Sequence, residues 1–191
     1  MYDSYKKAEN ILKNDGVVVL PTDTLYGLVA SVYSKKAVEK IFKIKERDKS
    51  KALIVLISSL KDLDIFGIKI DKEQAKILEK FWPGKVSVLL SCKNSKYKYI
   101  HRGTGEIAFR VIGARNKNLY NLLGKIGKIV APSANREGIK PAETVMEAKE
   151  YFGDLVDLYI NGGKKIGEPS TLIRLKKDGF EVLRQGKVFL V

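Results

Sequence analysis

Residues 17–28 read VVVLPTDTLYGL, an apolar run that passes directly into a turn rich in hydroxyl groups, with one carboxylate and one phenol. The run Val17–Leu20 predicts a buried strand, and Pro21 predicts its end. A buried strand that ends in polar side chains is how many α/β proteins build a pocket. Alternatively, Thr22–Thr24 only saturate the backbone of a turn. The segment alone leaves both interpretations open.

Outward from this segment, stretches with helical spacing alternate with short apolar stretches. Ser34 is a candidate helix cap, and the helix that it starts should fray by Arg47. The lysine- and tyrosine-rich residues 93–105 predict an exposed loop. We expect further helices within residues 3–14, 59–66, 71–82, 116–123 and 141–152, and strands at 17–20, 28–33, 53–57, 86–91, 107–112, 128–131, 156–160, 171–175, 181–184 and 188–191.

The alternation of helices and strands decides the fold class. Glycine-containing turns separate the strands expected after residue 155, which predicts hairpins on one sheet. The sequence has no internal repeat and no low-complexity linker. We therefore predict an α/β fold, one domain over residues 1–191 with a twisted mixed β-sheet and flanking helices.

The composition limits the classes of function. The chain has 191 residues, 45% of them apolar, as expected for one folded domain, and a net charge of +14. That charge predicts an anionic partner such as ATP or RNA, although scattered lysines also form ordinary solvated surfaces. With one cysteine, Cys92, and one histidine, His101, a zinc cage and a histidine-based triad are improbable.

The chain also lacks an apolar run near the roughly 20 residues of a membrane span, and its first residues lack a secretory apolar segment. We expect a cytoplasmic protein.

Cations gather where the helix from Ser34 should end. Lys45 and Arg47 share a face only if the helix has ended between them, and Lys49 and Lys51 follow in the loop. Such a group could hold phosphate oxygens. For any one lysine, a helix terminus that complements its own dipole is the simpler interpretation.

Hydroxyls and an amide follow the strand expected at 128–131. Ser133 and Asn135 repeat the spacing of two, and Pro132 forces the preceding residue toward extended geometry. Both side chains can therefore point one way and orient a phosphate or a ribose. Ser-Ala-Asn is also a common turn sequence.

Further polar side chains occur at strand positions. Arg110 lies inside an apolar strand, where a guanidinium usually has a bound anion or pairs with an acid such as Glu106. Ser170 and Thr171 offer hydroxyls at the start of a strand, and Arg184 ends the next one. Hydroxyls, an amide and cations suit nucleotidyl transfer by positioning and charge stabilisation, and the sequence has no Walker A motif and no nucleophile elbow.

The ordered series PTDTLYGL, KER, WPG, IAFRV, APSAN, PSTLI and LRQG resembles the threonylcarbamoyl-AMP synthase family, the YrdC-like proteins, in its single-domain form. The match spans nearly the whole chain and implies a YrdC-like fold. In that family a Lys-x-Arg and Ser-x-Asn set forms the catalytic core, which corresponds here to Lys45, Arg47, Ser133 and Asn135. By the same resemblance, threonine would be bound by Thr24, Arg110 and Ser170, with Tyr26 as a wall of the pocket, and ATP by Arg47, Lys51, Ser133, Asn135 and Arg184.

The resemblance implies the reaction of L-threonine, bicarbonate and ATP to threonylcarbamoyl-AMP and pyrophosphate, with Mg²⁺ on the phosphates and no protein metal site. The product would pass to a transferase complex that makes threonylcarbamoyladenosine in tRNA. A carbamate oxygen is already anionic, so the attack on the α-phosphate needs no strong base.

Some positions depart from the family pattern. Asp48 stands where a proline is usual, and Leu56 stands where longer relatives have a histidine. The main alternative is an RNA-binding module without catalysis, because residues 96–99 (KYKY) and Arg102 interleave cations with aromatic rings. A carbamoyl-transfer enzyme of the hydrogenase-maturation type is disfavoured, since its other domains and cysteine clusters are missing.

Overall fold

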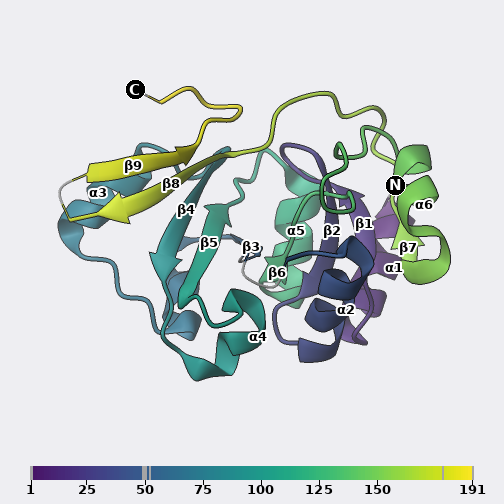
Figure 1. The fold of residues 1–191 in the computed structure, drawn as a ribbon, viewed down its shortest axis with the longest axis horizontal. Helices are drawn as coiled ribbons and strands as arrows, with labels where there is room; N and C mark the ends of the chain where they lie inside the picture. Colours follow the sequence, from purple (N-terminus) through teal and green to yellow (C-terminus); the bar gives the residue numbers. More distant parts are fainter. Residues whose placement is uncertain (1, 49–50, 52, 178, 191) are drawn as a thin grey trace.

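A mixed β-sheet runs through the whole molecule (Figure 1). The computed structural model describes residues 2–48, 51, 53–177 and 179–190. Within these residues the sheet has nine strands in the order β7-β1-β2-β6-β3-β5-β4-β8-β9. The strands are β1 Val18–Pro21, β2 Tyr26–Ser31, β3 Ile54–Ile57, β4 Val86–Ser91, β5 Glu106–Val111, β6 Ile129–Val130, β7 Leu158–Tyr159, β8 Thr171–Lys176 and β9 Gly179–Arg184.

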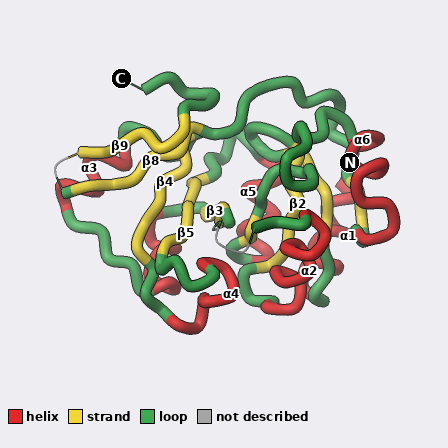
Figure 2. Tube along the Cα trace, in the orientation of Figure 1, coloured by secondary structure: helices red, strands yellow, loops and turns green. Residues whose placement is uncertain are grey.

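The helices lie on both sides of this sheet (Figure 2). No helix among the described residues is long and apolar enough to cross a membrane. The α-helices are α1 Tyr2–Lys13, α2 Lys35–Lys45, α3 Lys72–Glu79, α4 Lys98–His101, α5 Lys117–Ile126 and α6 Val145–Phe152, and the 3₁₀ helices are η1 Leu60–Phe66, η2 Ser95–Tyr97 and η3 Gly153–Leu155.

Two hydrophobic cores cover the two faces of the sheet. One core joins α1 and α5 to β1, β2, β6 and β3, with Leu12 and Leu119 fully buried. The larger core joins α2, η1, α4 and α6 to the other face, with Ile41 and Phe66 at its centre. The prediction of an α/β fold with a mixed sheet and flanking helices is therefore confirmed.

Strand β5 shows how the alternation of a strand places a charge. Phe109 and Val111 belong to the larger core, while the intervening Arg110 points to the opposite face. Arg110 pairs in register with Leu56 of the parallel strand β3, so the two side chains share that face. The strand thus holds a guanidinium in the middle of the sheet.

Helix α2 ends where the sequence predicts. Ser34 caps it by accepting a hydrogen bond from the Ala37 N–H at 3.0 Å. At the other end Glu46 adopts a left-handed conformation with φ of 52°, and its N–H bonds back to the Lys43 carbonyl at 3.1 Å. This turn ends the helix between Lys45 and Arg47, as their proposed common face requires.

Three sequence predictions about local structure were wrong. Residues 93–105 are not an exposed loop, because η2 and α4 bury Tyr97 and His101 against the core. Residues 188–190 are not a strand, and Val191 lies outside the described residues. The expected hairpins reduce to β8–β9, since β7 pairs with β1 at the opposite edge of the sheet. In each case tertiary packing overrides the local pattern.

We expect Phe109→Ala to lower the free energy of unfolding by about 3–5 kcal/mol, because it empties a fully buried site. The Phe109 ring packs edge-on to Phe66, with 4.9 Å between the centroids. Urea unfolding followed by circular dichroism measures the change. Phe189→Ala is the matched control, because that ring is 77% exposed, and it should change stability by less than about 0.5 kcal/mol. Equal effects of the two variants would contradict the proposed core.

Candidate functional site

A narrow cleft of about 50 Å³ brings together residues from across the whole sequence. Its walls come from the β1–β2 turn, the middle of β5, the loop after β6, the entrance to β8 and the end of β9. Six of the residues singled out in the sequence line it: Thr24, Tyr26, Arg110, Ser133, Ser170 and Arg184.

Lys45 lies behind this cleft and holds one of its walls. Its side chain is almost fully buried, at 2% exposure, and its ammonium donates hydrogen bonds to the carbonyls of Ser133 at 2.6 Å and Asn135 at 2.5 Å. A third contact reaches the Asn135 Oδ1 at 3.2 Å. An ammonium has three N–H donors, and here each has an acceptor. Lys45 therefore fixes the loop that carries Ser133 and Asn135.

The pKa of Lys45 is lowered to about 7, mainly by burial and also by the positive charge of Arg47, while Glu137 opposes both. Near neutral pH this amine consequently exists in both the charged and the neutral form. A negative group close by would restore the charge.

Ser133 and Asn135 do share one side of their loop. The Ser133 hydroxyl donates to the Asn135 Oδ1 at 2.6 Å, and the Asn135 Nδ2 donates to the Ile139 carbonyl at 2.8 Å. Backbone bonds fasten the same loop to β2, since the Ala134 N–H donates to the Tyr26 carbonyl at 2.8 Å. These bonds fix the loop, and Ser133 lines the cleft.

Arg47 and Lys51 lie beside the cleft. The Arg47 Nε donates to the Lys51 carbonyl at 3.2 Å, and the Lys51 ammonium forms an ion pair with Glu137. Burial lowers the pKa of Arg47, Glu137 raises it, and Arg184 lowers it, which brings this cation into the electrostatic field of the cleft. Lys49, the other cation predicted here, lies outside the described residues.

Arg110 forms a buried ion pair that the sequence did not identify. Its Nη2 lies 2.9 Å from the Asp23 Oδ1, and both side chains are mostly buried. The alternative that Arg110 pairs with Glu106 or another acid is confirmed in its second form, because the acid is Asp23, while Glu106 pairs with Arg174 at 3.2 Å. The only signal for Asp23 was a carboxylate in the same turn as Thr24, and a turn residue was the simpler interpretation.

Hydrogen bonds to neighbouring groups fix the hydroxyl side chains of the cleft. Thr22 donates to the Leu25 carbonyl at 2.7 Å and lies 3.3 Å from the Thr24 hydroxyl, so it shapes the turn. The Tyr26 hydroxyl donates to the Gly163 carbonyl at 2.8 Å, so only its ring is available as a wall. The Ser170 hydroxyl shares a 2.8 Å bond with that of Ser87.

Arg184 completes this wall. Its Nη2 donates to the Ser170 carbonyl at 2.9 Å, which ties the end of β9 to the entrance of β8. Burial lowers the pKa of Arg184, and the charge of Arg110 lowers it further. Two guanidinium groups therefore act on the same cleft.

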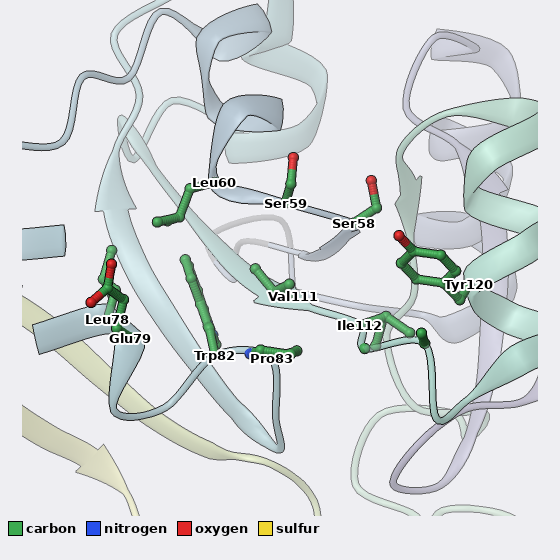
Figure 3. Close-up of a pocket in the computed structure, with 12 residues that line it drawn as sticks. Ser58, Ser59, Leu60, Leu78, Glu79, Trp82, Pro83, Val111, Ile112 and Tyr120 are labelled. Carbon is green, nitrogen blue, oxygen red and sulfur yellow. The ribbon is translucent and has the colours of Figure 1, made fainter. Parts of the chain in front are cut away.

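A larger cavity of about 300 Å³ lies at the carboxyl ends of β3 and β5, away from these cations (Figure 3). Trp82 and Leu60 form one side and Tyr120 the other. Its lining holds one carboxylate, Glu79, and neither lysine nor arginine. A polyphosphate would find no positive partner there, whereas the narrow cleft has Arg110 and Arg184 in its lining.

The cleft combines two guanidinium groups with hydroxyl side chains, while the Asn135 amide lies outside its lining and bonds to Ser133. Among the described residues there is no group of three His, Cys, Asp or Glu side chains that could hold a metal ion. The arrangement suits the binding of carboxylate or phosphate groups and the stabilisation of charge on them.

Comparison with known proteins places this geometry in a family. The family model described as telomere recombination, for Sua5, YciO and YrdC proteins, matches residues 10–186. The threonylcarbamoyl-AMP synthase of Pyrococcus abyssi is 30% identical over 181 residues, which cover 94% of this chain and 53% of that protein. The chain thus spans about half the length of that relative. The threonylcarbamoyl-AMP synthase of Nitrosococcus oceani is 30% identical over 168 residues, which cover 86% of this chain and 89% of that protein.

A solved structure, Sua5 of Pyrococcus abyssi complexed with L-threonine, is 29% identical and has a TM-score of 0.86, over 95% of this chain and 54% of the other. The resemblance stated from the sequence motifs is confirmed by a family match that covers nearly the whole chain and by the agreement in fold. The chain belongs to the Sua5/YciO/YrdC family.

Proposed function

We propose that this protein is an L-threonylcarbamoyladenylate synthase, a nucleotidyltransferase that converts ATP, L-threonine and bicarbonate to threonylcarbamoyl-AMP and pyrophosphate. The observation that carries the proposal is the convergence of Arg110, Ser133, Ser170 and Arg184 on one cleft, with Lys45 behind it. The names of the relatives support it as well.

The reaction divides into two steps. The threonine amine attacks the carbon of bicarbonate, which loses water and leaves an N-carboxylate, the carbamate. A carbamate oxygen then attacks the α-phosphorus of ATP, and the bond between the α-phosphorus and the bridging oxygen breaks, so that pyrophosphate leaves. The protein mainly has to hold both reactants in line and stabilise charge on the phosphates.

The proposed roles follow the positions of the side chains. Arg110 binds the threonine carboxylate, Thr24 and Ser170 offer hydroxyls to the same substrate, and the ring of Tyr26 forms a wall. The ATP contacts come from a second group, namely Arg47, Lys51, Ser133, Asn135 and Arg184.

Lys45 stabilises phosphate charge in this proposal through its loop and its own positive field. The three N–H groups of its ammonium already have carbonyl acceptors. It therefore acts at short range without being a direct phosphate ligand, and it holds the Ser133 hydroxyl where ATP binds.

Mg²⁺ enters as the companion ion of ATP. Mg²⁺ keeps several waters and binds substrate phosphates with few protein ligands, so a site without a cluster of three carboxylates among the described residues fits such an ion. We assign no residue of this chain to it.

We place the reaction in tRNA modification, with a transferase complex that receives the product, and we propose a cytoplasmic location. A direct contact with tRNA would use phosphate contacts at a basic groove of about 580 Å³, lined by Lys35, Lys96, Lys98 and Arg102. Of the two tyrosines in residues 96–99, Tyr97 is 1% exposed and is closed to base stacking, while the ring of Tyr99 lines this groove. The alternative of a purely RNA-binding module therefore keeps one of its two aromatic rings, that of Tyr99.

The decisive experiment measures pyrophosphate release from ATP. We expect release only when threonine and bicarbonate are both present, because the carbamate is the nucleophile. Serine and glycine serve as matched amino acids that lack the threonine side chain. Tight tRNA binding without this release would instead establish the RNA-binding alternative.

We predict that Lys45→Ala and Arg47→Ala each abolish turnover, because the first releases the Ser133–Asn135 loop and the second removes an ATP contact. Far-ultraviolet circular dichroism should show a folded chain for both. Lys61→Ala, at an exposed position on η1, is the control with normal turnover. Near-wild-type activity in either site variant would remove it from the proposed core.

The lowered pKa of Lys45 predicts proton uptake when ATP binds. Near pH 8 a lysine with a pKa of about 7 is mostly neutral in the free protein. The nearby triphosphate raises that pKa, so binding draws up to one proton from the buffer near pH 8 and none to Lys45 near pH 6, where it is already charged. Calorimetry in two buffers of different ionisation enthalpy measures this. Lys45→Met should lose the uptake and Lys61→Met should keep it, and identical uptake near pH 8 in wild type and Lys45→Met would refute the prediction.

A further inference from the structure

The Asp23–Arg110 ion pair leaves one buried N–H of the arginine without a partner among the described residues. The side chains are 3% exposed for Arg110 and 15% for Asp23, and one carboxylate oxygen lies 2.9 Å from Nη2. The Nε of Arg110 is buried and has no hydrogen-bond partner among the described residues. An unpaired buried donor on a charged group lowers the stability of the folded protein, and it is satisfied only when another group accepts a hydrogen bond from it.

The two members of the pair differ in their access to the cleft. Arg110 lines the cleft, and Asp23 does not, although its neighbours Thr22 and Thr24 do. A guanidinium presents its N–H donors in a rigid planar fork, so fixing one nitrogen fixes the direction of the others. Asp23 thus lies against the fork from the protein side, and the part of Arg110 that lines the cleft is left for a ligand.

The charges near Arg110 also indicate that Asp23 is needed to hold it in place. Arg184 lies close enough for its charge to interact with that of Arg110. Burial lowers the pKa of Arg110, and the charge of Asp23 raises it again. Without Asp23, a buried guanidinium would face a second guanidinium with no counter-charge, and its orientation would no longer be determined.

We propose that Asp23 is a positioning residue that orients Arg110 so that its guanidinium receives the carboxylate of the amino-acid substrate. This inference rests on the proposed function. Asp23 acts through Arg110 and does not touch the substrate amine, because Asp23 lies outside the cleft wall. Its effect must therefore disappear when the guanidinium is gone.

The test is a double-mutant cycle of Asp23→Asn and Arg110→Lys, assayed by pyrophosphate release. Asp23→Asn keeps the shape of the side chain and removes its charge. We expect it to raise the threonine KM by about tenfold or more, while kcat at saturating threonine and the KM for ATP change by less than about twofold. Arg110→Lys, which lacks the fork, should raise the threonine KM at least as much.

The double variant decides how Asp23 acts. Its threonine KM should equal that of Arg110→Lys alone, because no fork remains to be oriented. If Asp23→Asn multiplies the KM by the same factor in both backgrounds, Asp23 acts independently of Arg110 and the proposal is wrong. An unchanged threonine KM in the single Asp23→Asn variant overturns it as well.

The control is Asp62→Asn. Asp62 is also 15% exposed and pairs with a basic side chain, Lys128, at 2.8 Å, but it lies outside the cleft. It should lower the melting temperature and leave the threonine KM unchanged. A merely structural Asp23 would behave in the same way.

Threonine binding without ATP, measured by calorimetry, separates this proposal from the proposed function. If wild type binds threonine without any turnover, the synthase proposal fails, and the binding affinities of the same four proteins still decide the role of Asp23. If turnover depends on threonine but Asp23→Asn leaves KM and affinity unchanged, the positioning proposal alone fails. Absence of threonine binding in wild type overturns both.

Discussion

The site depends on the hydrogen bonds that one buried ammonium donates to backbone carbonyls. Lys45 ends α2 on one side of the sheet, and its Nζ reaches the carbonyls of Ser133 and Asn135 after β6. Helix α2 and this loop are thereby locked to each other across β2. Because the carbonyls use the whole donor capacity of the amine, the same interaction that shapes the wall also determines what the lysine can do for a ligand.

The sequence predicted most of the architecture, because burial patterns with periods of two and 3.6 are local properties. It placed the end of α2 before Arg47, and it put Ser133 and Asn135 on one side of a turn. The long-range contacts were beyond it. The carbonyls that accept from Lys45 have no signature in residue types, and nothing local distinguishes Asp23 from other acids as the partner of Arg110.

Residues 96–99 were predicted to lie in an exposed loop, and that prediction was wrong. Alternating lysine and tyrosine is typical of an exposed RNA-binding loop, yet here the alternation separates a solvent face from a core face. Lys96 and Lys98 remain exposed while Tyr97 packs against Phe66, with 4.5 Å between ring centroids. The same pattern describes a short helical segment on an apolar core, and only the tertiary structure separates the two.

The cleft draws its walls from Thr22 near one end of the chain to Arg184 near the other. Only a fragment that runs at least from Thr22 to Arg184 contains all of it, and β1 and β9 lie far apart in the order of the sheet. Such a site exists only after the slowest, most non-local strand pairings have formed. Ligand binding is therefore a reporter of complete folding, and a nascent or nicked chain that keeps either half of the sheet would have secondary structure but no affinity.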